Sequence, residues 1–163
     1  MTAMESRHLG PILLDGGAGG GAMEETIDFA GEQIRARLEI DYPDRLTQAA
    51  VDDIDVMLDH PQVADGLARD TIASALRRED SAAAQLFQAW EGARWGRDSS
   101  EEEFLRALRP VAMTITPDGG RVNPDRVVLA YGVGDGSATG LVTVRLRQWA
   151  PPEVDRTLAR GAA

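Results

Sequence analysis

Three stretches near the C-terminus alternate apolar and polar residues with a period of two, and this pattern constrains the fold more than any other feature of the chain. They cover residues 111–116, 127–133 and 142–147. Successive side chains of a β-strand point to opposite faces of its sheet, so the alternation predicts three strands with one buried and one solvated face. Turn-forming residues at 117–120 and 123–125 separate the first strand from the second.

A second alternating region lies near the N-terminus. Residues 27–29 and 34–41 alternate in the same way, and residues 30–32 (Ala-Gly-Glu) have the composition of a loop between them. This arrangement predicts a β-hairpin with one solvated face. Residues 1–8 are predicted to form a loosely ordered lead-in, and the glycine-rich residues 16–21 a turn or flexible loop.

The middle of the chain shows helical spacing, and we expect four helices. The first is predicted to be capped by Asp44 and to end near His60-Pro61, and the second to cover residues 62–78. The third follows Ser81, and a capping box that begins at Ser100 starts the fourth. The side chains expected to face the core are Leu46, Ala50, Ile54 and Met57, then Val63, Leu67, Ile72 and Leu76, then Leu86, Phe87 and Trp90, and last Phe104, Leu105 and Leu108.

The order of strands, then helices, then strands predicts an α+β domain. We expect an antiparallel sheet built from the N-terminal and C-terminal strands, with the four helices packed on one face. With 163 residues, of which 43% are hydrophobic, the chain has the size of one domain with one core. The predicted domain is 1–163, with residues 1–8 and 151–163 loosely ordered.

The formal net charge of −10 limits the partners that the chain can have. Nucleic acids and anionic membranes both require a positive surface, so the charge predicts neither and favours a basic protein. No apolar run approaches the roughly 20 residues of a membrane span, and we expect a cytoplasmic protein. The absence of cysteine excludes thiolate nucleophiles, and the absence of lysine excludes Schiff-base chemistry.

Three aspartates on the first predicted helix are the leading candidates for partner binding. Asp52, Asp55 and Asp59 fall on one helix face, roughly opposite the apolar stripe. They could steer a basic partner, such as a nuclease, to this face, or they could simply form a solvated surface. The calcium-loop pattern is missing around them, so we predict no metal site.

Two tryptophans are further candidates. Trp95 lies between two arginines, and Trp149 follows the parity of the solvated residues of the last strand. An exposed tryptophan beside arginine is typical of a protein interface. The alternatives are that Trp95 packs back on the core and that the C-terminal tail covers Trp149.

The glycine-rich stretch offers an enzymatic alternative. Gly17-x-Gly19-x-x-Ala22 follows an apolar run, and Glu39 or Asp41 lies about 20 residues further on, as in a dinucleotide-binding fingerprint. That chemistry requires a helix directly after the glycines, because the helix N-terminus holds the phosphates. The period-two pattern after Ala22 favours a flexible loop between strands. A helix beginning near Ala22 would favour the nucleotide interpretation, and a hairpin through Ala30-Gly31 would exclude it.

The pattern of strand and turn residues resembles a known family. Residues 27–41 form an acidic hairpin, residues 105–111 read Leu-x-x-Leu-Arg-Pro-Val, and Ile115-Thr116-Pro117-Asp118-Gly119 and Leu129-Ala130-Tyr131-Gly132-Val133-Gly134 follow. Over roughly Leu9 to Arg147 this pattern is similar to the bacterial family called domain of unknown function two-thousand-four. The resemblance implies a small acidic protein, in some cases associated with bacterial toxins, and implies no catalytic residue.

The sequence therefore predicts a non-catalytic acidic domain without a cofactor that binds another protein, in the manner of a toxin-neutralising immunity-type protein. His8 and His60 have no visible catalytic partner, and the serine nucleophile elbow is missing. The alternative is a nucleotide-binding enzyme or sensor that uses residues 16–21.

Overall fold

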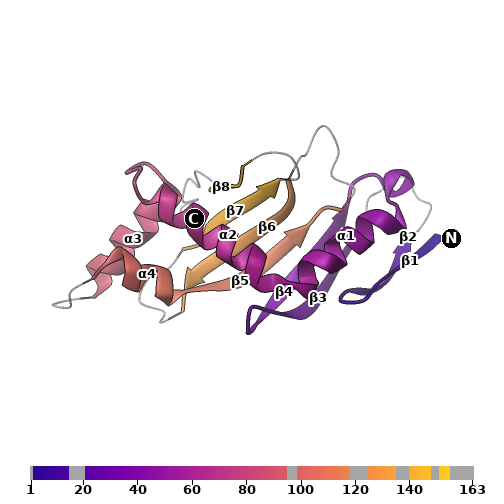
Figure 1. Cartoon of the computed structure of the whole chain (residues 1–163), viewed down its shortest axis with the longest axis horizontal. Coiled ribbons are helices and arrows are strands. Elements are labelled where there is room, and N and C mark those ends of the chain that lie inside the picture. Colours follow the sequence, from indigo (N-terminus) through magenta and orange to yellow (C-terminus); the bar gives the residue numbers. More distant parts are fainter. Residues whose placement is uncertain are drawn as a thin grey trace, which may run out of the picture.

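The computed structural model describes residues 2–14, 21–94, 99–117, 125–134, 140–147 and 151–154, and it confirms the α+β class. Its elements are β1 (Thr2–Ser6), β2 (Gly10–Leu14), β3 (Gly21–Phe29), β4 (Glu32–Ile40), the 3-10 helix η1 (Pro43–Arg45), α1 (Gln48–Asp59), α2 (Pro61–Ala75), α3 (Ala82–Ala93), α4 (Glu101–Ala107), β5 (Leu108–Ile115), β6 (Asp125–Val133), β7 (Val142–Arg147) and β8 (Glu153–Val154). Helices α1 and α2 lie across one face of the large sheet, and α3 and α4 lie at the end opposite the N-terminal hairpin (Figure 1).

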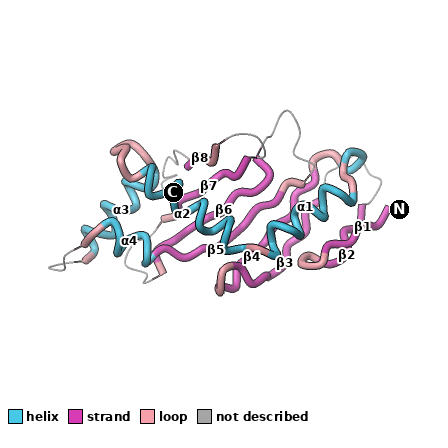
Figure 2. The backbone as a smooth tube through the Cα atoms, viewed as in Figure 1, coloured by secondary structure: helices cyan, strands magenta, loops and turns pink. Residues whose placement is uncertain are grey.

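The N-terminal and C-terminal strands join in one six-stranded sheet with the order β3-β4-β5-β6-β7-β8 (Figure 2). Neighbours pair antiparallel except β4 and β5, which are parallel, with Arg35 opposite Ala112. The expectation of a wholly antiparallel sheet is therefore wrong at this pairing. The reason is the helical block between the two strands. It carries the chain back to the end of the sheet where β4 began, so β5 runs in the same direction as β4.

The predicted hairpin is formed by β3 and β4. Only Ala30 and Gly31 lie between the strands, with φ values of 53° and 86°. A two-residue hairpin turn whose φ angles are both positive matches the right-handed twist of its strands, and glycine adopts such angles without steric cost. Glu32, which we expected in the loop, begins β4 and pairs with Phe29.

The helix starts depend on side-chain caps. Ser100 caps α4 as predicted, since its hydroxyl accepts a hydrogen bond from the backbone N–H of Glu103 at 3.2 Å. Ser81, which we expected only to precede α3, caps that helix by accepting from the Ala84 N–H at 3.0 Å. Asp44 does not cap α1. It lies in η1, and the cap is Thr47, whose hydroxyl accepts from the Ala50 N–H at 3.2 Å. The Tyr42-Pro43 step starts a separate 3-10 turn, which delays the α-helix.

The core lies between the helices and the inner face of the large sheet. Helix α2 turns three alanines and one isoleucine inward, so its buried residues are Ala64, Ala68, Ile72 and Ala75. Val63 and Leu67, which we expected to face the core, are 67% and 46% exposed. Alanine at the contact positions lets a helix approach the sheet closely, and the larger side chains one position away are left on the surface.

Residues 2–14 form a second, two-stranded sheet, in which β1 and β2 pair antiparallel. Leu9 and Ile12 are only 4% and 2% exposed, so this N-terminal hairpin belongs to the core. The expectation of a loose lead-in is wrong for residues 2–8. At the other end, Val154 pairs with Val144 in β7, so the predicted loose tail is ordered at Glu153–Val154, and residues 155–163 lie outside the described chain.

Candidate functional site at the corner of helices α1 and α2

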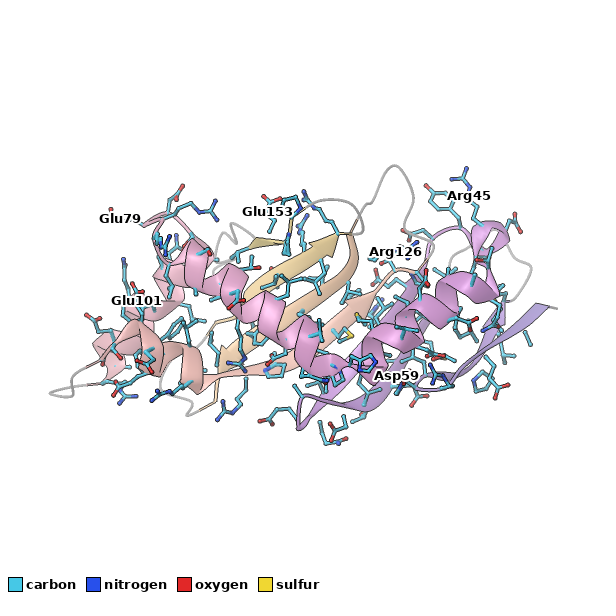
Figure 3. All side chains as sticks on the ribbon, viewed as in Figure 1. Arg45, Asp59, Glu79, Glu101, Arg126 and Glu153 are labelled. Atoms are coloured by element: carbon cyan, nitrogen blue, oxygen red, sulfur yellow. The ribbon has the colours of Figure 1, made fainter. Side chains whose placement is uncertain are left out.

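Helices α1 and α2 meet at a sharp corner that has different chemistry on its two flanks. Helix α1 ends at Asp59, His60 links the helices, and Pro61 is the first residue of α2. Proline suits the first helical position because its missing N–H would have had no helical partner there. Asp59 lies on the flank toward the N-terminal hairpin, and Arg126 lies on the opposite flank (Figure 3).

On the hairpin flank, Asp55 is buried, with 2% exposure. Its carboxylate accepts a hydrogen bond from the Ser6 hydroxyl at 2.5 Å and another from the Arg7 backbone N–H at 2.9 Å. These contacts hold the turn between β1 and β2 against α1. The expectation that Asp55 lies on a solvated face is wrong, because the hairpin covers it.

Asp59 contacts the same turn. The Arg7 guanidinium donates to its carboxylate at 2.7 Å, and His8 Nε2 lies 2.8 Å from the other oxygen. The hydrogen bond with His8, followed by that with Arg7, holds the pKa of Asp59 below its usual range. His8, expected to have no partner, is therefore part of an ion-pair cluster.

Asp52 remains exposed on α1 and accepts a hydrogen bond from Gln48 Nε2 at 2.9 Å. Gln48 also donates to the Glu5 carbonyl at 2.9 Å and accepts from the Glu5 N–H at 3.3 Å. The three predicted aspartates do share one flank of α1. Two of them are engaged by the chain's own hairpin, and Asp52 contacts it only through Gln48.

On the opposite flank a groove of about 470 Å³ opens between the corner and the ends of β6 and β7. It is lined by Asp53, Ile54, Val56, Met57, His60, Val63, Ala64, Leu67, Arg126, Val127, Leu146 and Arg147. Val56, Val63 and Leu67 are 56%, 67% and 46% exposed, which is unusual for three large apolar side chains so close together. We call these three residues the corner patch.

A partly buried polar network holds helix α2 in place beside the corner. The Tyr131 hydroxyl donates to Asp65 at 2.7 Å, and Arg69 Nε donates to the same carboxylate at 2.9 Å. The remaining Arg69 nitrogens donate to the carbonyls of Leu105 (2.7 Å) and Leu108 (3.1 Å). The network ties α2 to β6 and to the junction of α4 and β5. Burial, followed by the hydrogen bond to Asp65, raises the pKa of Tyr131 far above its ordinary value of 10.0.

Sequence reasoning missed this network and the corner patch. The spacing of Asp65 and Arg69, four residues apart on a helix, is a recognisable ion-pair signal. A tyrosine within a buried strand also needs a polar partner for its hydroxyl. No local signal indicated that Val63 and Leu67 face outward.

The two tryptophans and the glycine-rich stretch are the remaining sites predicted from the sequence, and the structure describes only part of them. Trp95, Trp149 and residues 16–20 lie outside the described chain, so the partner-binding role of the tryptophans stays a prediction. Residues 21–29 form β3 and continue into the hairpin, so no helix begins near Ala22. The dinucleotide interpretation requires that helix, and it is therefore excluded on the structural criterion stated above.

Within the described residues, no group of three metal-ligating side chains comes together. None of the helices in that part of the chain has the length and apolar character needed to cross a bilayer. A scan against protein-family models, a search of curated proteins and a search of solved structures found no match. The resemblance to domain of unknown function two-thousand-four stays an expectation, and the class that the structure shows is a mixed-sheet α+β protein.

Proposed function

We propose that this chain is a non-catalytic cytoplasmic domain that binds a basic protein at the corner of α1 and α2, in the manner of a toxin-neutralising immunity protein. The observation that carries the proposal is the corner patch. Protein interfaces combine an apolar centre with a polar rim, and Val56, Val63 and Leu67 supply such a centre.

The rim and the net charge favour a basic partner. Asp53 lines the same groove as Val56 and is 67% exposed, and Asp52 is exposed on the hairpin flank of α1. With a net charge of −10, the chain would attract a positively charged protein over a distance of about one Debye length, which speeds the first encounter. Asp55 takes no direct part in this interface, because its contacts lie within the chain.

The proposal is tested by capturing partners from the source cells with the tagged wild-type chain and with two variants in which a valine is replaced by aspartate. Val63→Asp places a charge in the corner patch, and Val111→Asp makes the same change at a 41% exposed position on β5 as a control. We expect one stoichiometric basic protein on the wild type and on the Val111→Asp variant, released at high salt and absent from the Val63→Asp variant. Equal recovery by all three chains, or recovery of no stoichiometric companion by any of them, contradicts the proposal.

A further inference from the structure

One polar atom in the wall of the groove is left unsatisfied. Arg126 Nε is buried and has no hydrogen-bond partner among the residues that the structure describes. The guanidinium has a single ion-pair contact there, between its NH1 nitrogen and Asp53 Oδ2 at 3.6 Å, which is too long for a hydrogen bond. The side chain is only 21% exposed. Buried donors in native proteins are nearly always satisfied, so Nε is an exception. Because the protein itself covers Nε, a ligand in the groove would reach the guanidinium through the exposed part of the side chain.

A β-bulge aims Arg126 into the groove. In the pairing of β6 with β7, Asp125 lies opposite Arg147 and Val127 lies opposite Leu146, so Arg126 is an extra residue in its strand. Regular alternation would place Arg126 and Val127 on opposite faces of the sheet. Instead both line the groove on the helix side, because a bulge turns two consecutive side chains toward one face.

The rest of the groove is suited to an apolar chain. Its walls are formed mostly by aliphatic side chains and Met57, and its polar residues are Asp53, His60, Arg126 and Arg147. The volume of about 470 Å³ falls within the range of roughly 300–1,000 Å³ that is typical of small-molecule sites. Such a site excludes polar ligands along most of its length and selects for a charged group at the arginine.

The charges around Arg126 indicate which head group fits. An arginine offers parallel N–H donors that match a carboxylate. Arg147, the other cation of the groove, is paired with Glu153 at 2.8 Å, and Asp53 lies beside Arg126. Two arginines are thus balanced by two carboxylates, so these groups carry no net charge, and a ligand with a single negative charge is favoured over a phosphate that carries two.

We propose that the groove binds a small amphipathic carboxylate, with its alkyl chain along α1 and α2 and its carboxylate on Arg126. The corner patch forms part of the groove wall, so the ligand and the protein partner proposed above would occupy overlapping surfaces. The ligand is tested on the isolated chain, so the outcome of its test does not depend on that partner. The class includes medium-chain fatty acids and aryl-alkyl carboxylic acids.

The test compares three probes with closely matched eight-carbon chains: octanoate, octan-1-ol and octyltrimethylammonium. Isothermal titration calorimetry with the whole chain should show the tightest binding for octanoate. Replacing octanoate by hexanoate should weaken binding, because each methylene removed costs about fourfold in affinity. Tighter binding of the cation than of octanoate overturns the proposal, because it would mean that Asp53 and the overall acidity dominate the site.

Paired variants separate the head of the ligand from its tail. Arg126→Gln should weaken octanoate binding about tenfold or more and leave octan-1-ol unchanged. Arg35→Gln removes the same charge at a 76% exposed site on β4, outside the groove, and should have no effect. Leu67→Gln, at an exposed position in the wall, should weaken all three probes alike. Asp53→Asn should strengthen octanoate binding, because it removes a competing carboxylate.

Each variant is first checked by thermal unfolding, so that a loss of binding is not confused with a loss of folding. If Arg126→Gln folds and binds octanoate as well as the wild type does, Arg126 does not recognise the carboxylate and the proposal is wrong. If octanoate produces no saturable heat with the wild type, the groove is not a site for this class of ligand.

Discussion

The hydroxyl of Tyr131, at the centre of the large sheet, donates a 2.7 Å hydrogen bond to Asp65 on α2. Tyr131 is fully buried, and the Asp65 side chain that accepts the bond is 16% exposed, so the bond is largely shielded from water. Arg69 completes the arrangement by donating to the same carboxylate. This contact sets the position of α2 on the sheet, and the position of α2 in turn sets the outward direction of Val63 and Leu67.

Replacing Tyr131 with Phe should lower the free energy of unfolding by about 1–2 kcal/mol, because one oxygen of Asp65 loses its donor while Arg69 still binds the other. Urea unfolding measures the change. Tyr42→Phe, at a 42% exposed position, is the control and should cost less than about 0.5 kcal/mol. Equal effects of the two variants would mean that the buried bond adds nothing to stability.

The raised pKa of Tyr131 predicts a pH dependence in the alkaline range. Above pH 10 the unfolded chain releases the phenolic proton while the folded chain keeps it, so stability is complete below the ordinary value of 10.0 and falls as pH rises past it. The slope attributable to Tyr131 should approach about 1.4 kcal/mol per pH unit. The difference between the wild-type and Tyr131→Phe unfolding curves isolates this contribution, and parallel curves would contradict the prediction.

Asp55→Ala should detach the N-terminal hairpin from α1. The variant leaves the Ser6 hydroxyl and the Arg7 N–H without their acceptor, at a cost of about 2–3 kcal/mol. Asp52→Ala, on the same helix but exposed, is the matched control, with an expected cost within about 0.5 kcal/mol. Hydrogen exchange should show loss of protection in residues 3–9 for Asp55→Ala alone, and unchanged protection would show that other contacts hold the hairpin.

The lowered pKa of Asp59 predicts that acid loosens the same hairpin. A carboxyl whose folded pKa is depressed contributes stability above its unfolded value, here 3.8, and loses it as pH falls through the folded pKa. We expect the protection factors of the Arg7 and His8 amides, which correct for the intrinsic pH dependence of exchange, to fall below about pH 3.8 in the wild type. In an Asp59→Asn variant the exchange should already be faster at neutral pH and should lack this acid step.

The cap of α1 offers a further check on the fold. Thr47→Ala should cost about 1 kcal/mol, because the Ala50 N–H loses its acceptor, whereas Thr47→Ser keeps it. Asp44→Ala should have almost no effect, since Asp44 lies in η1. Thermal unfolding of the three variants distinguishes the cap observed here from the cap that the sequence suggested.

Local patterns predicted the secondary structure well, and long-range contacts explain what they missed. The alternation in residues 127–133 and the hairpin around Gly31 are properties of short segments, so they could be read directly. The burial of Asp55 depends on Ser6, which lies far away in the sequence, and no helical pattern contains that information. In the same way, the direction of Arg126 depends on its being an extra residue in β6, and this becomes visible only once the partner strand is placed.

The parallel pairing of β4 with β5 has a consequence for the chain as it leaves the ribosome. Hairpin β3–β4 can close through its two-residue turn soon after synthesis, but the neighbour of β4 follows only after the whole helical block. We expect pulsed hydrogen exchange during refolding to protect the β3–β4 amides before those shared by β4 and β5. Until β5 is made, β4 is an open edge strand, and its alternating charges Arg35, Arg37 and Glu39 are of the kind that discourages pairing with other nascent chains.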